Sequence, residues 1–452
     1  MEPRIISRAE HGISRQDINE NALKVLYRLK SNGFRGYLAG GCVRDLLLGR
    51  TPKDFDVATD ATPQQIRKIF FNCRLIGRRF RLAHIHYGDD IIEVATFRAN
   101  IPVEDNLDEQ HVTIEDGMVL RDNRWGTPEQ DARRRDFTIN AMFYNIEDFS
   151  VIDYVGARED LEERIIKLIG DPFVRYIEDP VRMLRAVRFA TTLDLNIGDD
   201  EHKAMVQQAE HILNAAPARL YEEFLKFLYS GASAKAIPML LDVGILQHIF
   251  PSWAHWLQHE ASEADRKWVD QALRQADIWK TNDRKADAPL LYGLMFGSYH
   301  EWLANAIPDV QRYQAIHEAV ESHYESFRLR VSMPRRQMTQ MMHIASCQPR
   351  FEKTHGKVPH KFAERHYFPE ALVYFQFAQG LRGDNPELAT WWKDFVKENP
   401  QTARKPVRPK KAPRRRKPRG PKPTTPTTPT TPTTPTTPTT PTTPTTPKPA
   451  DA

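Results

Sequence analysis

The chain has 452 residues, 40% of them hydrophobic and 27% charged, which is typical of a soluble protein with room for two or three domains. It has no run of about 18 apolar residues, so we expect no transmembrane segment. Its first residues hold no apolar signal core. The cysteines Cys42, Cys73 and Cys347 form no CxxC pair, which indicates neither a disulfide framework nor a zinc site and fits the cytoplasm.

The net charge of +5 is distributed unevenly along the chain. Residues 401–452 hold 12 Lys and Arg and one acid, whereas the preceding 400 residues hold 52 bases and 58 acids. The main body is therefore mildly acidic. A basic tail of this kind usually binds a polyanion, either nucleic acid or an anionic membrane surface. A solvated, solubilising extension is the alternative.

Residues 1–15 are predicted to be a flexible lead, and a mixed pattern of helices and strands follows up to about residue 160. Helical spacing and end signals predict helices over 17–33, 43–49 and 62–72. GYLAGG is a short apolar run that leads into Gly40 and Gly41. Strands are predicted in DFDVAT and twice within 78–98, where the chain turns at Tyr87–Asp90. RDFTINAMFYN and VIDYV then predict a further helix and a strand at the edge.

From about residue 165 the helical spacing is continuous, and no clear strand is predicted before residue 395. The second part of the chain is therefore predicted to be all-α. Eight Thr-Thr-Pro repeats occupy residues 424–447, behind a stretch rich in Lys, Arg and Pro. Such a composition cannot form a core, so we predict a disordered tail with polyproline II character.

The stretch TPKDFDVATD (51–60) places Asp54 and Asp56 two residues apart on a predicted strand, so both carboxylates project from one face. Two carboxylates so close together repel unless a cation lies between them, and Mg²⁺ is the hard cation that binds such oxygens. We therefore predict a magnesium site at this pair. The alternative is a simple turn, because Thr-Pro-Lys-Asp is also good turn chemistry.

Gly40 and Gly41 lie just upstream of this pair, in front of a predicted helix. Glycines let backbone amides approach a ligand closely, and the helix N-terminus adds partial positive charge. Arg44, on the first turn, is predicted to clamp a phosphate. One element would then hold a triphosphate while the other holds its metal ions.

Glu93 is a third candidate acid, on a strand with apolar neighbours. A carboxylate in such a run needs a reason, because burying it unpaired is costly. A two-metal phosphoryl-transfer site requires a further carboxylate, which favours a catalytic role. An edge strand with Glu93 facing water is the alternative.

The stretch RRRDFTINAMFYN (133–145) sets three arginines, of which Arg135 is the last, against Asp136. Asn140 follows one helical turn later on the same face. Arginines suit phosphate and ribose contacts, so Asp136 is predicted either to complete the site or to orient an arginine. It would also serve as a helix N-cap.

In EDPVRMLRAVRF (178–189), Arg182, Arg185 and Arg188 recur every three residues behind Asp179. A carboxylate and a guanidinium can together meet the edge of adenine, which predicts a face that reads the nucleotide base. Cytosine presents a similar donor and acceptor, so pocket size has to discriminate. The alternative is a weak Asp179–Arg182 surface pair.

Four motifs, GGCVRDLLLG, KDFDVATDATP, RRRDFTINAMFYN and EDPVRMLRAVRFA, together resemble the class II template-independent nucleotidyltransferases of the polymerase-β superfamily. That family contains the bacterial poly(A) polymerases and the tRNA CCA-adding enzymes. The resemblance covers about residues 35–230. LIGRRFRLAHIHYGDDIIEVATFR, PARLYEEFLKFL, SMPRRQMTQ and the basic tail resemble the poly(A) polymerase branch more closely. The Thr-Thr-Pro repeats are not part of the family pattern.

The resemblance implies an α+β protein. A nucleotidyltransferase head with a small mixed sheet would span 16–160, followed by a helical neck (161–235), a helical body (236–400) and the tail (401–452). It also implies that Asp54 and Asp56 hold two Mg²⁺ ions, with Asp136 or Glu93 as the third catalytic acid. Nucleotide contacts are implied for a larger set: Gly40, Gly41, Arg44, Arg135, Asn140, Asp179, Arg182, Arg185 and Arg188.

The function implied is template-independent addition of AMP from ATP to RNA 3′ ends, with release of pyrophosphate. This addition would promote RNA decay. Partners from the decay machinery or an RNA chaperone are compatible with it. A CCA-adding or A-adding tRNA enzyme is the close alternative. More distant alternatives are a non-catalytic RNA-binding adaptor, which the intact Asp54–Asp56 pair argues against, and an antibiotic or protein nucleotidyltransferase, which leaves the two arginine-rich motifs unexplained.

Overall fold

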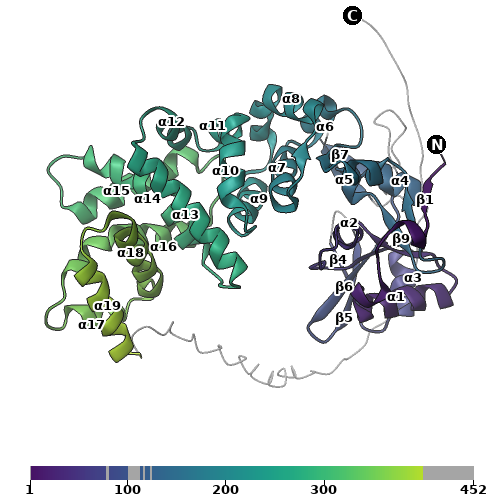
Figure 1. Ribbon diagram of the computed structural model, residues 1–452, viewed down its shortest axis with the longest axis horizontal. Helices are drawn as coiled ribbons and strands as arrows, with labels where there is room; N and C mark the ends of the chain where they lie inside the picture. Colours follow the sequence, from purple (N-terminus) through teal and green to yellow (C-terminus); the bar gives the residue numbers. More distant parts are fainter. Residues whose placement is uncertain (1, 78–80, 100–111, 116–117, 123–124, 401–452) are drawn as a thin grey trace, which may run out of the picture. The chain divides into compact units, whose positions relative to one another are not determined.

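The computed structural model describes residues 2–77, 81–99, 112–115, 118–122 and 125–400, all within the unit Met1–Lys405 (Figure 1). The disorder predicted for 401–452 lies outside these residues. The boundaries predicted at about 160 and 235 fall inside this unit and stay predictions. Among the described residues, every helix is too short or too polar to cross a membrane.

The first part of the chain contains a mixed sheet of eight strands in the spatial order β1-β10-β9-β2-β3-β6-β5-β4. Neighbouring strands are antiparallel except β3 and β6, which are parallel. This confirms the predicted α+β fold with a mixed sheet. The strands are β1 (Arg4–Ile6), β2 (Gly36–Ala39), β3 (Asp56–Thr59), β4 (Cys73–Ile76), β5 (Leu82–Tyr87), β6 (Asp90–Thr96), β9 (Phe143–Asn145) and β10 (Val151–Asp153).

Short helices accompany this sheet. Helix α1 packs on β2, β3 and β6 through buried apolar side chains at helical spacing. Helix α3 begins where its sequence predicts, with Thr62 and Gln65 forming a capping box around Pro63. The elements are η1 (Arg8–Glu10), η2 (Arg15–Asp17), α1 (Glu20–Ser31), α2 (Gly41–Leu47), α3 (Pro63–Ile69), β7 (Val112–Glu115), β8 (Met118–Asp122), α4 (Pro128–Arg133), η3 (Thr138–Asn140) and α5 (Ala157–Glu162).

Helices make up most of the remainder. They are α6 (Pro172–Glu178), α7 (Val181–Leu193), α8 (Asp199–Gln207), η4 (Ala209–Asn214), α9 (Pro217–Leu228), α10 (Ser233–Asp242), α11 (Ile245–Ile249), α12 (Pro251–His259), α13 (Glu263–Thr281), α14 (Ala288–Asn305), α15 (Arg312–Phe327), α16 (Arg335–Ser346), η5 (Gln348–Glu352), α17 (Val358–Ala363), α18 (Phe368–Arg382) and α19 (Pro386–Glu398). One parallel strand pair, β11 (Ile165–Ile166) and β12 (Asn196–Ile197), lies among them.

Four sequence-based expectations were wrong in detail. The lead at 1–15 is not unstructured, because β1 pairs with β10 at the edge of the sheet. Strand β3 begins at Asp56, so Asp54 precedes the strand. No α-helix begins at Asp136, which is followed by extended Phe137 and the three-residue turn η3. The helical part also contains β12, which is too short to give a period-2 pattern.

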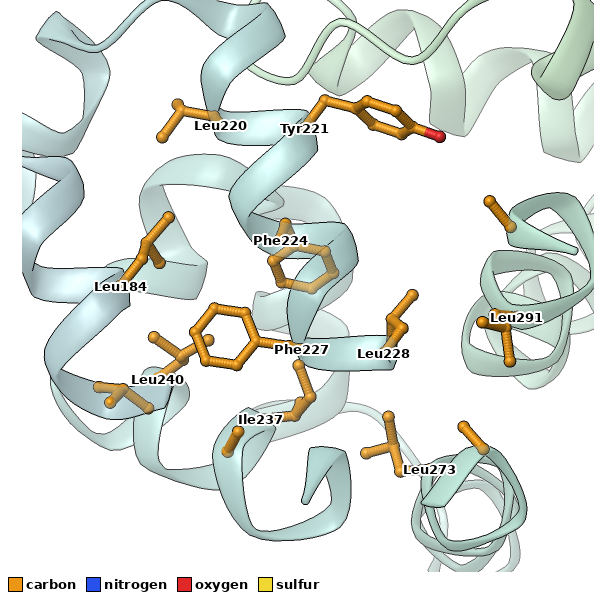
Figure 2. Close-up of a cluster of buried hydrophobic side chains, with 14 of the residues drawn as sticks. Leu184, Leu220, Tyr221, Phe224, Phe227, Leu228, Ile237, Leu240, Leu273 and Leu291 are labelled. Carbon is orange, nitrogen blue, oxygen red and sulfur yellow. The ribbon is translucent and has the colours of Figure 1, made fainter. Parts of the chain in front are cut away.

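Helix α9 is central to the helical core. Its apolar residues Leu220, Phe224, Phe227 and Leu228 recur at helical spacing and are at most 1% exposed. Figure 2 shows them packed among side chains from α7, α10, α13 and α14, including Leu184, Ile237, Leu240, Leu273 and Leu291. Burial of side chains of this size stabilises the fold by about 2 kcal/mol each. Because α7 and α9 share this core, the polar residues of α7 keep a fixed position relative to those of α9.

Candidate active site

Three predicted carboxylates lie at the parallel central strands of the sheet. Asp54 and Asp56 are both exposed, whereas Phe55 between them is buried, so the two aspartates share one side although β3 includes only the second. Strand β6 places Glu93 in register with Asp56. We call Asp54, Asp56 and Glu93 the carboxylate group.

The negative charges of the carboxylate group repel one another. Nearby protein atoms partly desolvate the Asp56 carboxyl, and this effect, with the negative charges of Glu93 and Asp54, raises the pKa of Asp56 to about 6. The positive charge of Arg135 acts in the opposite direction. A bound cation would offset the repulsion that contributes to this shift.

Glu93 faces the solvent from an interior strand. Its side chain is 47% exposed, and its Oε1 lies 3.1 Å from Nε2 of His84 on β5. Strand β6 lies between β3 and β5, so the edge-strand alternative is wrong, although Glu93 does face water. Its charge acts on Asp56, whereas that of Asp136 is not among the principal influences there.

The glycine turn packs directly against an arginine. Gly40 has a φ of 78° and precedes helix α2, and a Cβ at this position would lie 2.8 Å from Nη1 of Arg135. Only glycine fits there without displacing that guanidinium. Arg135 is held by Asp131, whose Oδ2 accepts from Nη2 at 3.0 Å, and by the Asn140 carbonyl, which accepts from Nη1 at 2.9 Å.

A chain of polar contacts connects the glycine turn to helix α7. Nη1 of Arg44 donates to Oδ1 of Asn140 at 2.6 Å, and Nδ2 of Asn140 donates to Oδ1 of Asp136 at 3.5 Å. Oδ2 of Asp136 accepts from Nε of Arg185 at 2.7 Å. We call Arg44, Arg135, Asp136, Asn140 and Arg185 the guanidinium network.

Asp136 is ionised within this network. Burial opposes its charge, but the charge and hydrogen bonds of Arg185, together with the Phe137 amide, hold the pKa of Asp136 below its ordinary value. Of the two predicted roles, the geometry therefore matches the orientation of an arginine. The orienting partner is Arg185, 49 residues downstream, and not the adjacent arginines, since Arg133 and Arg135 pair with Glu129 and Asp131.

Three guanidinium groups surround the ring of Phe189. Those of Arg44, Arg185 and Arg188 lie 5.3, 5.4 and 4.7 Å from its centroid. Nε of Arg188 is buried and has no hydrogen-bond partner among the described residues. Burial and the positive charge of Arg185 lower the pKa of Arg188, and Glu223 gives only a 4.0 Å ion pair. Arg188 therefore has donor capacity left for a ligand.

The two side chains predicted to read the base, Asp179 and Arg182, each pair with another residue in the structure. Both carboxylate oxygens of Asp179 accept from Arg219 of α9, at 2.8 Å each. Arg182 donates instead to Oε2 of Glu178 and to the Arg175 carbonyl, at 3.0 and 2.8 Å. The alternative of an Asp179–Arg182 pair is thus wrong. Arg219 was not identified from the sequence, because it lies 40 residues from Asp179 and carries no local signal. The Asp131–Arg135 pair could have been identified, because residues four apart on a helix can pair.

The donor set determines how a metal ion could be bound. Within the described ranges, no three His, Cys, Asp or Glu side chains lie close enough to hold an ion by themselves. Mg²⁺ commonly takes one or two carboxylates and completes its shell with water and substrate phosphates. Asp54 and Asp56 fit that kind of site, in which the nucleotide supplies the remaining oxygens.

Comparison with known proteins matches three segments of the chain to models of one family. Residues 36–167 match the poly A polymerase head domain. Residues 194–257 match the probable RNA and SrmB-binding site of polymerase A, and residues 308–424 match the arginine-rich C-terminus of polymerase A.

Relatives match along nearly the whole chain. Poly(A) polymerase I of Salmonella typhimurium is 39% identical over 440 residues, covering 91% of this chain and 93% of that protein. Poly(A) polymerase I of Haemophilus influenzae is 38% identical, covering 91% and 95%. The CCA-adding enzyme of Geobacillus kaustophilus is 33% identical but covers only 55% of this chain and 59% of that enzyme.

Solved structures support the same fold. The CCA-adding enzyme of Bacillus stearothermophilus in complex with CTP aligns with a TM-score of 0.57 at 24% identity, covering 84% of this chain and 82% of that one. That likeness concerns the fold alone. Identity to Poly(A) polymerase I over nine-tenths of the chain, with the ordered motifs and three matched segments, shows that this chain belongs to the poly(A) polymerase I family of nucleotidyltransferases.

Proposed function

We propose that the protein is a poly(A) polymerase that transfers AMP from ATP to RNA 3′ ends and releases pyrophosphate. The observation that carries this proposal is the register of Asp56 with Glu93, beside the Gly40 turn and the guanidinium network. It joins an electronegative site for a cation to an electropositive site for phosphates. The 39% identity to Poly(A) polymerase I over 91% of the chain favours ATP and RNA as substrates.

In the proposed reaction, the RNA 3′-hydroxyl attacks the α-phosphate and the pyrophosphate leaves. Asp54 and Asp56 would hold Mg²⁺, and the ion would supply a lowered pKa for the attacking hydroxyl and neutralise charge on the triphosphate. Glu93 increases the negative charge at this site. The triphosphate lies at the amides of the Gly40–Gly41 turn.

The arginines have divided roles in this proposal. Arg188 has an unpartnered Nε and contacts phosphate as charge develops in the transition state. Arg44 and Arg185 are already bonded to Asn140 and Asp136, so they define the shape of the pocket and supply a positive field. Asp136 keeps Arg185 in position and is not a metal ligand in this scheme.

Base selection is assigned to Asp179 and Arg182. Without a template, the protein itself must present the hydrogen-bonding groups that distinguish adenine from cytosine. The pairing of Asp179 with Arg219 and of Arg182 with Glu178 fixes both side chains. Two side chains held in fixed positions suit one base better than two bases of different size, which supports the use of ATP alone.

In this proposal, parts of the chain outside the active site also bind RNA. The match of 194–257 to a probable RNA and SrmB-binding site supports RNA contacts and a protein partner of the decay or RNA-chaperone type. The basic tail at 401–452 adds non-specific affinity, with a salt dependence of about 0.7 log units per phosphate contact. The free thiols of Cys42, Cys73 and Cys347 suit the cytoplasm, where both substrates occur.

Primer extension tests the proposed function. Purified protein with Mg²⁺ receives either an unstructured RNA or a tRNA lacking its 3′ end, with ATP, CTP or both. We expect long A-tails on the generic RNA and no use of CTP. Addition of two or three nucleotides, CTP included and only on tRNA, would instead establish the CCA-adding alternative. No incorporation on either RNA would contradict catalysis altogether.

A further inference from the structure

A large cleft opens beside the carboxylate group. Its volume is about 1120 Å³, and it begins at Arg50 and Lys53, in the connection between α2 and β3. It continues past Arg188 and the end of α9 to the connection between α13 and α14. Lys53 adjoins Asp54, and its Nζ lies 3.8 Å from that carboxylate. At this end the cleft borders the proposed catalytic centre through Lys53 and Arg44, and no member of the carboxylate group lines it.

The lining of this cleft is basic. Eight Lys and Arg side chains line it against four acids, and one of the acids, Asp45, is bound at 2.7 Å by Arg44. The basic side chains are Arg44, Arg50, Lys53, Arg188, Lys226, Lys280, Arg284 and Lys285. Such an excess favours a polyanionic ligand. We call this space the basic cleft.

An aromatic side chain accompanies the charges. Tyr229 is 38% exposed in the cleft, and its hydroxyl donates to the Ala286 carbonyl at 3.0 Å, which ties the end of α9 to the connection after α13. Arg284 lies with its guanidinium 4.9 Å from the ring centroid of Trp279, which is itself buried. An exposed ring within a basic groove is the combination by which proteins hold single-stranded nucleic acid.

The cleft has room for more than one nucleotide. Its volume of about 1120 Å³ exceeds the range of about 300–1,000 Å³ that is usual for one small ligand, and the proposed function places the triphosphate at the glycine turn. The far end of the cleft, at Lys280, Arg284 and Lys285, belongs to the segment 258–307, which lies between the matched family segments. The comparisons therefore assign that end no role.

We propose that the basic cleft holds the single-stranded RNA directly upstream of the reacting 3′ end. Phosphates contact Lys280, Arg284 and Lys285 at the far end and Arg50 and Lys53 near the site, and one base stacks on Tyr229. This inference rests on the proposed function, since it locates the path of the RNA substrate of that same site.

The first test removes the charge at the far end. The full-length triple variant K280A/R284A/K285A is compared with K24A/K30A/K68A, which removes equal charge from exposed positions of α1 and α3 outside the cleft. The Kd of a 15-nucleotide oligo(A) is measured by fluorescence anisotropy at several salt concentrations. Three lost phosphate contacts should reduce the salt slope by about 2 and weaken binding 10- to 100-fold. The control triple should bind like the wild type.

Catalysis separates the failure of the path from the failure of the function. We expect the cleft variant to raise KM for the 15-nucleotide primer, while KM for ATP on a dinucleotide primer stays within twofold. A raised KM for ATP with unchanged RNA affinity would make the cleft a nucleotide subsite and overturn the proposal, as would wild-type RNA affinity and salt slope. A wild-type enzyme that incorporates no AMP would contradict the proposed function instead.

The second test concerns the stacking residue. Tyr229→Phe keeps the ring and loses the hydroxyl contact with Ala286, whereas Tyr229→Ala loses both. We expect a 5- to 50-fold loss of RNA affinity in the alanine variant only, in line with about 1–2 kcal/mol per stacked base. An equal loss in both variants would show that the hydroxyl contact is the cause, and equal binding by all three proteins would exclude stacking. Either result would overturn the role given to Tyr229.

Discussion

The carboxylate group and the guanidinium network lie side by side in one site, yet they differ in almost every physical respect. Asp54, Asp56 and Glu93 are exposed or half-exposed, and desolvation together with the negative charges of Glu93 and Asp54 raises the pKa of Asp56 to about 6. In the network, Asn140 and Arg44 are 8% exposed, and the pKa of Asp136 is lowered by its partner Arg185. Among the described residues, no ion pair of the carboxylate group is as close as the one between Asp136 and Arg185 in the guanidinium network.

This difference indicates what each group contributes. The counter-charges beside the carboxylate group are weak, since the exposed Lys53 lies 3.8 Å from Asp54 and His84 lies 3.1 Å from Glu93, so the group gains further stabilisation when a cation binds. Charges that shape the pocket satisfy one another within the protein, where burial makes an unpaired charge expensive. Removing a side chain of the carboxylate group should therefore lower activity and leave the stability of the fold unchanged. Removing a member of the guanidinium network should lower both activity and stability.

The largest expected effect is on catalysis, from Asp54→Asn or Asp56→Asn. Losing a metal ligand removes several kcal/mol of transition-state stabilisation, at about tenfold in rate per 1.4 kcal/mol, so AMP incorporation should fall about 10³-fold or more. The midpoint of thermal unfolding should stay the same or rise, because a repulsive charge is lost. Asp89→Asn, at an exposed acid in the turn between β5 and β6, is the control and should retain activity. Normal incorporation by Asp54→Asn would contradict the assignment of the site.

The second effect is on stability, from Asp136→Ala. Its partner Arg185 would be left with a largely buried charge, so the free energy of unfolding should fall by about 3 kcal/mol, as measured by urea denaturation. Activity should fall as well, since Arg185 loses its position.

A double-mutant cycle isolates the pair. Arg185→Leu alone leaves the Asp136 carboxylate without its ion-pair partner, whereas the double variant Asp136→Ala/Arg185→Leu leaves no unpaired charge. The double variant should therefore be more stable than the sum of the two single losses predicts. Strict additivity would show that the two side chains do not interact, and the contrast between the two groups would then disappear.

The third effect is a pH dependence, and it has opposite signs in the two groups. The raised pKa of Asp56 means that, without metal, the folded protein takes up a proton between about pH 6 and the ordinary 3.8, so this residue's contribution to stability increases as the pH falls. The lowered pKa of Asp136 means that its contribution is present above its ordinary pKa and is lost as the pH falls through the folded-state value.

Mg²⁺ binding makes this contrast measurable. The ion competes with the proton at Asp56, so the affinity for Mg²⁺ should be constant above about pH 6 and fall about tenfold per pH unit below it. Glu93→Gln removes one of the charges that raise this pKa, so the break should move to lower pH. Isothermal titration between pH 5 and pH 8 measures both proteins. A break that stays near pH 6 in the variant would show that Glu93 does not act on Asp56.

Local sequence signals predicted the elements that carry the site. The capped helix α3, the hairpin of β5 and β6 and the glycine turn before α2 all depend on residues close together in the chain, and the structure contains them. The α+β class and the helical second part followed in the same way. The strand β3 was predicted two residues too early, because a period-2 alternation does not reveal where the hydrogen-bonded ladder begins.

The pairing of charges could not be read from the sequence. Asp136 follows three arginines but binds Arg185, and Asp179 lies three residues from Arg182 but binds Arg219. The Asp179–Arg219 pair depends on how α7 and α9 pack through their buried apolar side chains (Figure 2). The Asp136–Arg185 pair depends on how Phe137 packs on α7, where its ring lies 5.5 Å from that of Phe189. The motifs predicted which residue types gather at the site, and the core determines which of them meet.

The smallest expected effect comes from Arg219→Lys. Lysine keeps the charge but cannot bind both oxygens of Asp179 in parallel, so Asp179 gains rotational freedom. Arg219 is 46% exposed, so the free energy of unfolding should change by less than about 1 kcal/mol. Selectivity should respond more than stability, because the proposed base choice depends on a fixed Asp179 carboxylate. We expect the ratio of kcat/KM for ATP to that for CTP to fall about 3- to 10-fold, equivalent to about 1 kcal/mol.

Arg274→Lys is a matched control, because Arg274 also pairs with an aspartate, Asp270, on the exposed side of α13 and lies outside the basic cleft. It should leave the ratio unchanged. If Arg219→Lys lowers kcat/KM equally for both nucleotides, Asp179 contributes to binding without discriminating between bases, and selectivity must then come from pocket size. If only the ATP value falls, the α9 residue acts on the base through Asp179, and the core that positions α9 takes part in substrate choice.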